Sequence, residues 1–279
     1  MKKTSQIFDP RQTMRGSEFE IFHYRDARPT DVAVHHHDFY EIYFFVSGTV
    51  EYWVEGRTYK LRPGDLMLIH PMQLHRPIID PDTLYERIVL WIDQKYLEHL
   101  SPDGDVLLSA FEGGSANILH PSPLTRTELQ DRFNALVREY YSQEAGARLC
   151  ARGLFLQTLV EISRLSMRSE APRKTKEETA DLTSRVLAFI SEHYRQDLTL
   201  GSLSEYFFVS KYHLSHEFSR STGISVYRFI LLKRLQVARR LLQEGKAPGE
   251  VYLECGFKDY TNFYRAFKAE YGVSPRRVI

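Results

Sequence analysis

The chain has 279 residues, of which 43% are hydrophobic and 26% charged, values that are ordinary for a soluble globular protein and allow two compact domains. No apolar run approaches the ~18 residues of a membrane span, and the polar start, Met1 to Ser5, does not resemble a secretory signal. The only cysteines, Cys150 and Cys255, give neither a disulfide framework nor metal-ligand spacing. These features predict a cytoplasmic protein with no membrane partner.

The net charge of +1 conceals an uneven distribution. Residues 182–279 carry 15 Lys and Arg against 9 Asp and Glu, a balance of +6, whereas residues 1–181 carry 22 against 27, a balance of −5. A basic C-terminal third attached to a mildly acidic body is typical of a module that binds phosphates.

From Val32 to about Asp93 the sequence is rich in short β-branched and aromatic runs, such as residues 40–46 and 50–54. Turn signals such as Pro63-Gly64-Asp65 separate these runs. Many short strands at this spacing predict a barrel or a sandwich.

The same region holds histidines in an ordered pattern. His35 and His37 are followed by Glu41 and Gly48, and Pro71 is followed by His75. This order resembles the two motifs of the cupin family, although the second is one residue short and lacks its asparagine. It also resembles the N-terminal effector domain of AraC-type sugar regulators, which implies a cupin-like β-barrel.

Alternate side chains of a strand share a face, so His35, His37, Glu41 and Tyr43 are expected to project together, with His75 on a neighbouring strand. Three histidines and a carboxylate are a metal-ligand set, but regulators of this kind commonly keep the pattern without metal, and we predict none. Aromatic planes beside Arg and His suit a sugar or another hydroxylated ligand. The predicted effector-binding residues are His35, His37, Glu41, Tyr43, Trp53, His75, Arg87 and Trp91.

From Ser122 to Arg168 apolar residues fall at helical spacing, which predicts two amphipathic helices beside the barrel. Their apolar faces need a partner, which is either the barrel or a second subunit, and we predict a homodimer through residues 122–168. The polar segment 169–181, broken by Pro172, is predicted to be a linker between domains at 1–168 and 182–279.

Residues 203–218 predict a helix-turn-helix, because apolar anchors at Leu203, Phe207, Leu214 and Phe218 suit two short helices, and Ser210 can cap the second. A similar unit follows at residues 251–268, with a turn glycine at 256 and Asp259 as the cap. Between them residues 225–242 predict one helix of about 25 Å, suited to set two recognition helices in neighbouring major grooves about 34 Å apart.

The stretches 221–225, 232–238, 255–268 and 271–275 together resemble the signature of the AraC family of transcription regulators. The resemblance covers nearly all of residues 182–279 and implies which side chains touch DNA. In the first recognition helix these match Tyr212, Ser215 and His216, and in the second Tyr260, Thr261, Asn262, Tyr264 and Arg265. Lys211, which is expected to lie exposed on the same side of the first helix, is also predicted to contact DNA. The chain departs from the family at Ser204 and Tyr252, where alanine is usual, and at Pro248, which puts the packing of the second unit in doubt.

The sequence therefore predicts a two-domain α+β protein: an N-terminal cupin-like β-barrel with two flanking helices and a C-terminal all-α tandem helix-turn-helix. The expected function is sequence-specific binding of double-stranded promoter DNA under control of a small-molecule effector, expected to be a sugar, with no catalytic residues and no cofactor. Two alternatives stay open at this point. One is a metal-dependent cupin enzyme with a DNA-binding tail, and the other is a regulator whose barrel serves only for dimerisation.

Overall fold

The structure is a computed structural model that describes residues 13–29, 32–100, 107, 111, 118–168 and 182–278. The chain divides into two compact units, Met1–Glu177 and Glu178–Ile279. The predicted linker, residues 169–181, lies outside the described residues, and the division between the units falls within it.

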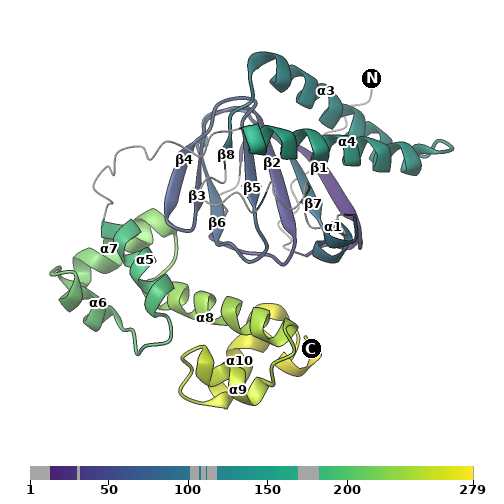
Figure 1. The fold of residues 1–279 in the computed structure, drawn as a ribbon. Coiled ribbons are helices and arrows are strands. Elements are labelled where there is room, and N and C mark those ends of the chain that lie inside the picture. Colours follow the sequence, from purple (N-terminus) through teal and green to yellow (C-terminus); the bar gives the residue numbers. More distant parts are fainter. Residues whose placement is uncertain are drawn as a thin grey trace. The chain divides into compact units, whose positions relative to one another are not determined.

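The N-terminal unit is built on two antiparallel sheets (Figure 1). The larger sheet has the order β1 (Phe19–Asp26), β7 (Tyr85–Ile92), β2 (Tyr40–Ser47), β5 (Leu66–Ile69) and β8 (Ile118–Leu119). The smaller sheet has the order β4 (Arg57–Lys60), β3 (Val50–Val54) and β6 (His75–Ile79).

One face of the larger sheet is covered by helices, as Figure 1 shows. These are α1 (Gln94–Leu100), α3 (Pro123–Tyr140) and α4 (Ala147–Arg168). Ile42 and Leu90 of the sheet pack there with Phe133 of α3 and Phe155 of α4, all of them fully buried. The two helices predicted between residues 122 and 168 thus bury one side against the sheet, because their apolar residues repeat at the period of a helix.

The other face of the larger sheet faces the smaller sheet. Tyr43, Phe45 and Tyr85 of the larger sheet share one buried cluster with Tyr52 and Val54 of β3. Along β2 the side chains alternate between the two clusters, since successive residues of a strand point to opposite faces. This shared cluster is called here the sandwich interior.

The prediction of a closed barrel needs correction. The strand ladders of the described residues form two separate sheets. The isolated bridge between His35, which precedes β2, and His75 of β6 lies outside these ladders. The sequence motifs identify strands and turns. Barrel closure depends on hydrogen bonds between strands that are distant in sequence, and the local sequence pattern does not show these bonds.

Strands β1 and β8 and helix α1 of this unit were not predicted. Strand β1 is an edge strand that pairs with β7 over its whole length, and α1 follows β7 directly. The outer edge of β1 is covered by α3 and the residue after it, because the Tyr141 hydroxyl donates to the Ile21 carbonyl at 2.6 Å. Such cover protects an edge strand from pairing with another chain.

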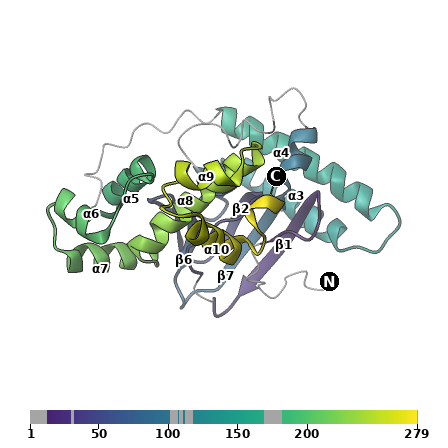
Figure 2. The ribbon, with the colours of Figure 1, turned by 90° about the horizontal axis from the view of Figure 1, so that it is seen from below.

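The C-terminal unit is helical: α5 (Leu182–His193), α6 (Leu200–Tyr206), α7 (Lys211–Thr222), α8 (Val226–Gln243), α9 (Pro248–Glu254), α10 (Tyr260–Tyr271) and the short η1 (Pro275–Arg277). In both Figure 1 and Figure 2, α5, α6 and α7 gather at one end of α8, and α9 and α10 gather at the other. Helices α6 and α7 form one helix-turn-helix, α9 and α10 form the second, and α8 connects them.

The loop at residues 194–197 joins parts of this unit that are far apart in sequence. Arg234 of α8 donates to the carbonyls of Tyr194 at 2.8 Å and Gln196 at 2.7 Å. Lys258, in the turn before α10, pairs with Asp197 at 2.6 Å. The loop therefore contacts both the connecting helix and the second helix-turn-helix.

Candidate DNA interface and effector site

The first recognition helix, α7, begins at the cap predicted from the sequence. The Ser210 hydroxyl accepts a hydrogen bond from the backbone N–H of His213 at 3.1 Å, and the helix ends at Gly223 in the left-handed conformation. Leu214 and Phe218 are fully buried, so they fix which side of α7 faces outward.

The residues predicted to contact DNA lie on that outward side of α7. Lys211, Tyr212 and His216 are exposed, Tyr212 by 80%, and Ser215 is half-buried between them. Tyr212, Ser215 and His216 line a shallow hollow together with Arg220. Donors and acceptors on the free side of a recognition helix are suited to read base edges and bind phosphates.

The second recognition helix, α10, begins with a chain of side-chain contacts. Asp259 accepts the backbone N–H of Asn262 at 2.7 Å and also the side-chain amide of Asn262. The Asn262 carbonyl oxygen in turn accepts from the Arg265 guanidinium at 2.7 Å. Thr261, Asn262 and Arg265 are exposed, so the helix cap holds Arg265 in place on the outward face.

Two tyrosines predicted to contact DNA, Tyr260 and Tyr264, are half-buried. The Tyr260 ring lies edge-on to Tyr252 at 5.7 Å between centroids. Tyr252 thus replaces the usual alanine without entering the core, since its ring packs against the start of α10. Ser204, the matching residue of the first unit, is buried and donates to the Gly201 carbonyl at 2.8 Å.

Pro248 lies in the first turn of α9, where its missing N–H has no helical partner to lose. The second unit therefore accommodates both departures from the family pattern. The turns of the two units are closed by equivalent backbone hydrogen bonds. In the second unit the Phe257 N–H donates to the Tyr252 carbonyl, and in the first the Val209 N–H donates to the Ser204 carbonyl, each at 3.0 Å.

In the N-terminal unit the predicted effector residues converge, although not along one strand as expected. His35 and His37 precede β2, which begins at Tyr40, and His35 is bridged to His75 of β6. The rings of His35 and His75 lie 4.3 Å apart and those of His37 and His75 4.8 Å apart. His37 and His75 are buried, and His35 is half-buried.

Glu41 is the centre of this cluster. Its carboxylate accepts hydrogen bonds from Trp91 Nε1 at 2.8 Å and from the Tyr52 hydroxyl at 3.1 Å, and it lies 3.3 Å from His37 Nε2. Burial alone would raise the pKa of Glu41, but the adjacent imidazoles, of which that of His37 is the nearest, hold that pKa below its ordinary value. Burial lowers the pKa of His75, and lowers that of His35 to about 4.

A second polar group lies at another place in the sandwich interior. Arg87 pairs with Asp26 and lies over the rings of Tyr24 and Tyr85, at 4.8 and 4.3 Å. The Tyr43 hydroxyl bonds that of Tyr85, and burial raises the pKa of Tyr85 to about 12. The predicted residues Tyr43 and Arg87 thus share the interior with the histidine cluster, because Glu41 and Tyr43 of β2 and Arg87 and Trp91 of β7 face the same side.

Three of these residues have the geometry to hold a cation. The ligand atoms of His37, Glu41 and His75 all lie within 4.8 Å of one another. Nδ1 of His37 faces the Phe39 carbonyl at 2.9 Å and Nδ1 of His75 faces the Gln73 carbonyl at 2.8 Å, so each Nδ1 carries the proton. Both Nε2 atoms are buried without a hydrogen-bond partner in the described residues. Two imidazole lone pairs and a carboxylate suit a divalent ion; the expectation that the site works without one stays a prediction.

Trp53 lies elsewhere. Its neighbours Tyr52 and Val54 point into the sandwich interior, so Trp53 points to the opposite face of the smaller sheet. Sequence reasoning chose Trp53 and missed Tyr52, which touches Glu41. Glu51 shares the face of Trp53 and is exposed, whereas Trp53 itself is buried.

Two helix-turn-helix units with exposed polar and basic recognition faces, joined to a sheet domain with a buried polar cluster, define a DNA-binding regulator with a ligand-binding domain. The model of the AraC-like ligand binding domain matches residues 20–159, and a helix-turn-helix domain model matches residues 203–279. The chain belongs to the AraC family of transcription regulators, and these matches indicate a regulator rather than an enzyme.

Curated relatives extend over most of the chain. The HTH-type transcriptional regulator YbfI of Bacillus subtilis (strain 168) is 31% identical over 236 residues, which cover 82% of this chain and 80% of YbfI. The HTH-type transcriptional activator RhaS of Escherichia coli (strain K12 / DH10B) is 25% identical over 257 residues, covering 89% and 87%.

Among solved structures, ToxT from Vibrio cholerae aligns over 93% of this chain and 97% of its own, with 13% identity and a TM-score of 0.37. The DNA-binding domain of AdpA, solved with a target DNA, aligns over 35% of this chain and 88% of its own, with 24% identity and a TM-score of 0.34. In the described part of the chain, every helix is too short or too polar to span a membrane.

Proposed function

We propose that this chain is a cytoplasmic regulator that binds promoter DNA through α7 and α10 as a homodimer and responds to a small hydroxylated molecule, such as a sugar, in the sandwich interior. The observation that carries the proposal is the convergence of His37, Glu41, His75 and Trp91 in one buried cluster of the ligand-binding domain. A cluster of this kind costs folding free energy unless its groups find partners, which makes it a candidate binding site.

On the DNA side, the proposed contacts are the eight residues matched to the family and Lys211, which lies beside them on α7. Their arrangement supports different roles. Arg265 is held by Asn262 on the exposed face of α10 and suits a bidentate contact with guanine, whereas Lys211 at the start of α7 suits a phosphate. Tyr260 packs on Tyr252, so its proposed contribution is to position the start of α10 as well as to contact DNA.

On the effector side, the proposed contacts are His35, His37, Glu41, Tyr43, His75, Arg87 and Trp91, with Tyr52 added and Trp53 removed. His35 is the least buried of the histidines, so we place the entrance beside it. A ring with several hydroxyl groups could exchange hydrogen bonds with Glu41 and the imidazoles while it packs on Trp91, which combines orientation with apolar contact.

The test is a thermal-shift screen against sugars, followed by variants. A ligand that binds only the folded state raises the melting temperature, and His37→Ala with His75→Ala should remove that shift. Trp53→Phe is the matched control, because Trp53 lies on the other face of its sheet and its variant should keep the shift. Circular dichroism must show both proteins folded. A folded double variant that keeps the shift would place the effector outside the sandwich interior.

For the homodimer, the supporting feature is an apolar stripe on α4. Leu149, Leu156 and Met167 are exposed by 73%, 37% and 57%, and their spacings of seven and eleven residues place them on one face of the helix. A groove of about 620 Å³ between α3 and α4 lies beside the stripe and is lined by Leu156. Exposed apolar surface in a regular stripe is typical of a surface that another helix covers.

The proposed interface is a second copy seated on this stripe. Leu156→Glu with Met167→Glu should convert a dimer into a monomer in sedimentation equilibrium, because two carboxylates would be buried between the copies. Leu253→Glu is the control, since Leu253 is an exposed leucine on α9, outside this hairpin. A double variant that sediments like the unaltered protein as a dimer would locate the interface elsewhere.

A further inference from the structure

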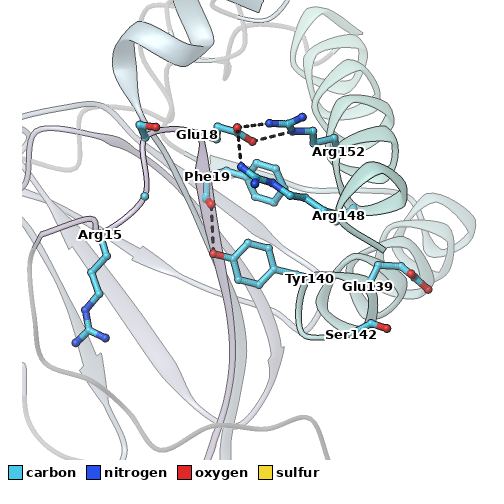
Figure 3. Close-up of a pocket in the computed structure, with 11 residues that line it drawn as sticks. Arg15, Glu18, Phe19, Glu139, Tyr140, Ser142, Arg148 and Arg152 are labelled. Carbon is cyan, nitrogen blue, oxygen red and sulfur yellow. Dashed lines mark hydrogen bonds and ion pairs between the residues drawn. The ribbon is translucent and has the colours of Figure 1, made fainter. Parts of the chain in front are cut away.

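A second candidate site lies outside the sandwich interior, at the start of β1. Residues 15–19 face the hairpin of α3 and α4 across a pocket of about 540 Å³ (Figure 3). This volume is within the range of small-molecule sites. Its walls carry arginines from two segments: Arg15 on one side, and Arg148 and Arg152 of α4 on the other.

The side of the pocket formed by residues 15–18 is held in place by hydrogen bonds to Glu20 of β1. The backbone N–H groups of Arg15 and Gly16 both bond the Glu20 carboxylate, the second at 2.7 Å, and Glu20 is buried. The aromatic part of the lining is fixed too, because Tyr140 donates to the Phe19 carbonyl at 3.4 Å and its ring lies 5.6 Å from that of Phe19. The pocket is therefore bounded by positioned groups.

The arginines of α4 converge on one internal carboxylate. Arg152 donates to Glu18 through Nε at 2.9 Å and through a second nitrogen, and Arg148 Nη2 lies 3.3 Å from the same carboxylate. The hydrogen bond from Arg152 and the charge of both arginines hold the pKa of Glu18 below its ordinary value despite its partial burial. Two guanidinium groups thus share a single negative charge.

This arrangement leaves guanidinium N–H donors available for a ligand. A guanidinium has five N–H donors, and Arg148 uses one of them on Glu18 while most of its side chain is exposed. Arg148 and Arg152 are also like charges one helical turn apart in the first two turns of α4, where the helix dipole disfavours cations. A second anion beside Glu18 would relieve this repulsion. The other carboxylate of the lining, Glu139, lies 3.8 Å from Arg138.

We propose that this pocket binds a small organic carboxylate with an apolar body, whose negative group pairs with Arg148 and Arg152 and whose body packs on Tyr140. Glu18 occupies the same guanidinium groups in the free protein and competes with the ligand. The site is separate from the proposed effector site, since the two share no residue.

The probe is benzoate, titrated into the full-length protein and followed by the Nε–Hε signals of the arginines in ¹H–¹⁵N spectra. Benzyl alcohol, which lacks the charge, and inorganic phosphate, which lacks the apolar body, are the control ligands. Glu18→Gln removes the competing charge and should tighten benzoate binding about fivefold or more, whereas Arg148→Gln should weaken it by a similar factor. Arg132→Gln, which removes an arginine of the same hairpin from its pair with Glu161, should change the affinity less than about twofold.

The opposite signs of Glu18→Gln and Arg148→Gln distinguish a ligand site from a structural ion pair. If the cluster only fastens β1 to α4, both variants lower stability and neither changes benzoate binding, which would overturn the proposal. Equal binding of benzoate and benzyl alcohol would overturn it as well. The His37→Ala, His75→Ala protein should bind benzoate normally, so failure here and failure of the proposed effector site are independent results.

Discussion

The turns of the two helix-turn-helix units carry one backbone geometry with different residues. Phe208 and Gly256 occupy matching positions, with φ of 56° and 80°, and their N–H groups donate three residues back to Glu205 and Leu253. Placing alanine at both positions therefore compares one side chain in two surroundings. We expect Gly256→Ala to be strongly destabilising and Phe208→Ala to be nearly neutral.

The expected magnitude follows from what the new Cβ meets. At Gly256 it would lie 2.8 Å from the Arg195 carbonyl oxygen and 2.9 Å from that of Tyr194, backbone atoms that no side-chain rotation can move. The left-handed conformation costs a residue with a Cβ roughly 1–2 kcal/mol, and overpacking adds about 1–3 kcal/mol. The expected loss in the free energy of unfolding is about 2–5 kcal/mol. Phe208 already has a Cβ in the left-handed conformation and is 95% exposed, so its replacement by alanine should change the free energy of unfolding by about 0.5 kcal/mol or less.

The assay is urea unfolding of the full-length variants. Unfolding is monitored by the helical circular dichroism signal, to which the C-terminal unit contributes most. A difference between the two variants of less than about 1 kcal/mol would refute the reasoning, because it would mean that the loop at residues 194–197 moves freely away from the second turn. Lost DNA binding by Gly256→Ala at temperatures where it remains folded would extend the same conclusion to function.

Three further predictions concern DNA and pH. Arg265→Ala should lose affinity for the operator more than for scrambled DNA, by about 1–3 kcal/mol of discrimination, while Lys233→Ala on the connecting helix should lose equally on both; fluorescence anisotropy on the two sequences measures this. The logarithm of the DNA association constant should fall linearly with the logarithm of salt concentration, and a flat line would contradict an interface built on the +6 charge of residues 182–279. Burial lowers the pKa of His75 and brings that of His35 from 6.5 to about 4, so on acidification the unfolded chain binds protons before the folded one does. The free energy of unfolding, measured with a chelator present, should therefore fall from pH 6.5 toward pH 4. The expected slope is up to about 1.4 kcal/mol per pH unit for each histidine. His75→Gln should flatten that slope in urea titrations at stepped pH.

The features that sequence predicted well are those set by neighbours along the chain. Ser210 and Asp259 were identified as helix caps, and each accepts the N–H three residues on, because a cap depends on the local backbone alone. The same holds for α3, whose apolar period predicted the buried residues Leu129, Phe133, Leu136 and Val137. In α4 the period predicted a helix but not its buried face, since Leu159 and Ile162 are buried whereas Leu149 and Leu156 are exposed.

The features that sequence predicted less well depend on strand pairing. The pattern of His35, His37 and Glu41 predicted that these residues lie together, but through a wrong geometry. The two histidines lie before β2, where His37 approaches Glu41 at 3.3 Å and His35 is bridged to His75 of β6. Trp53 was predicted to lie with them because an aromatic plane beside Arg and His suits a hydroxylated ligand. Only the pairing of β3 with its neighbours shows which parity of that strand faces the interior.

The loop at residues 194–197 also bears on which operators the protein can use. Arg234 and Lys258 fasten it to the connecting helix and to the second turn, so the two recognition helices belong to one packed unit. Inserting one base pair between the two half-sites rotates the second by about 34–36°, given 10–10.5 base pairs per turn. If the two helices keep their spacing, the duplex must twist or bend instead, at a cost on the order of 1–6 kcal/mol. The protein then discriminates between operators by the distance between their half-sites as well as by their base sequence.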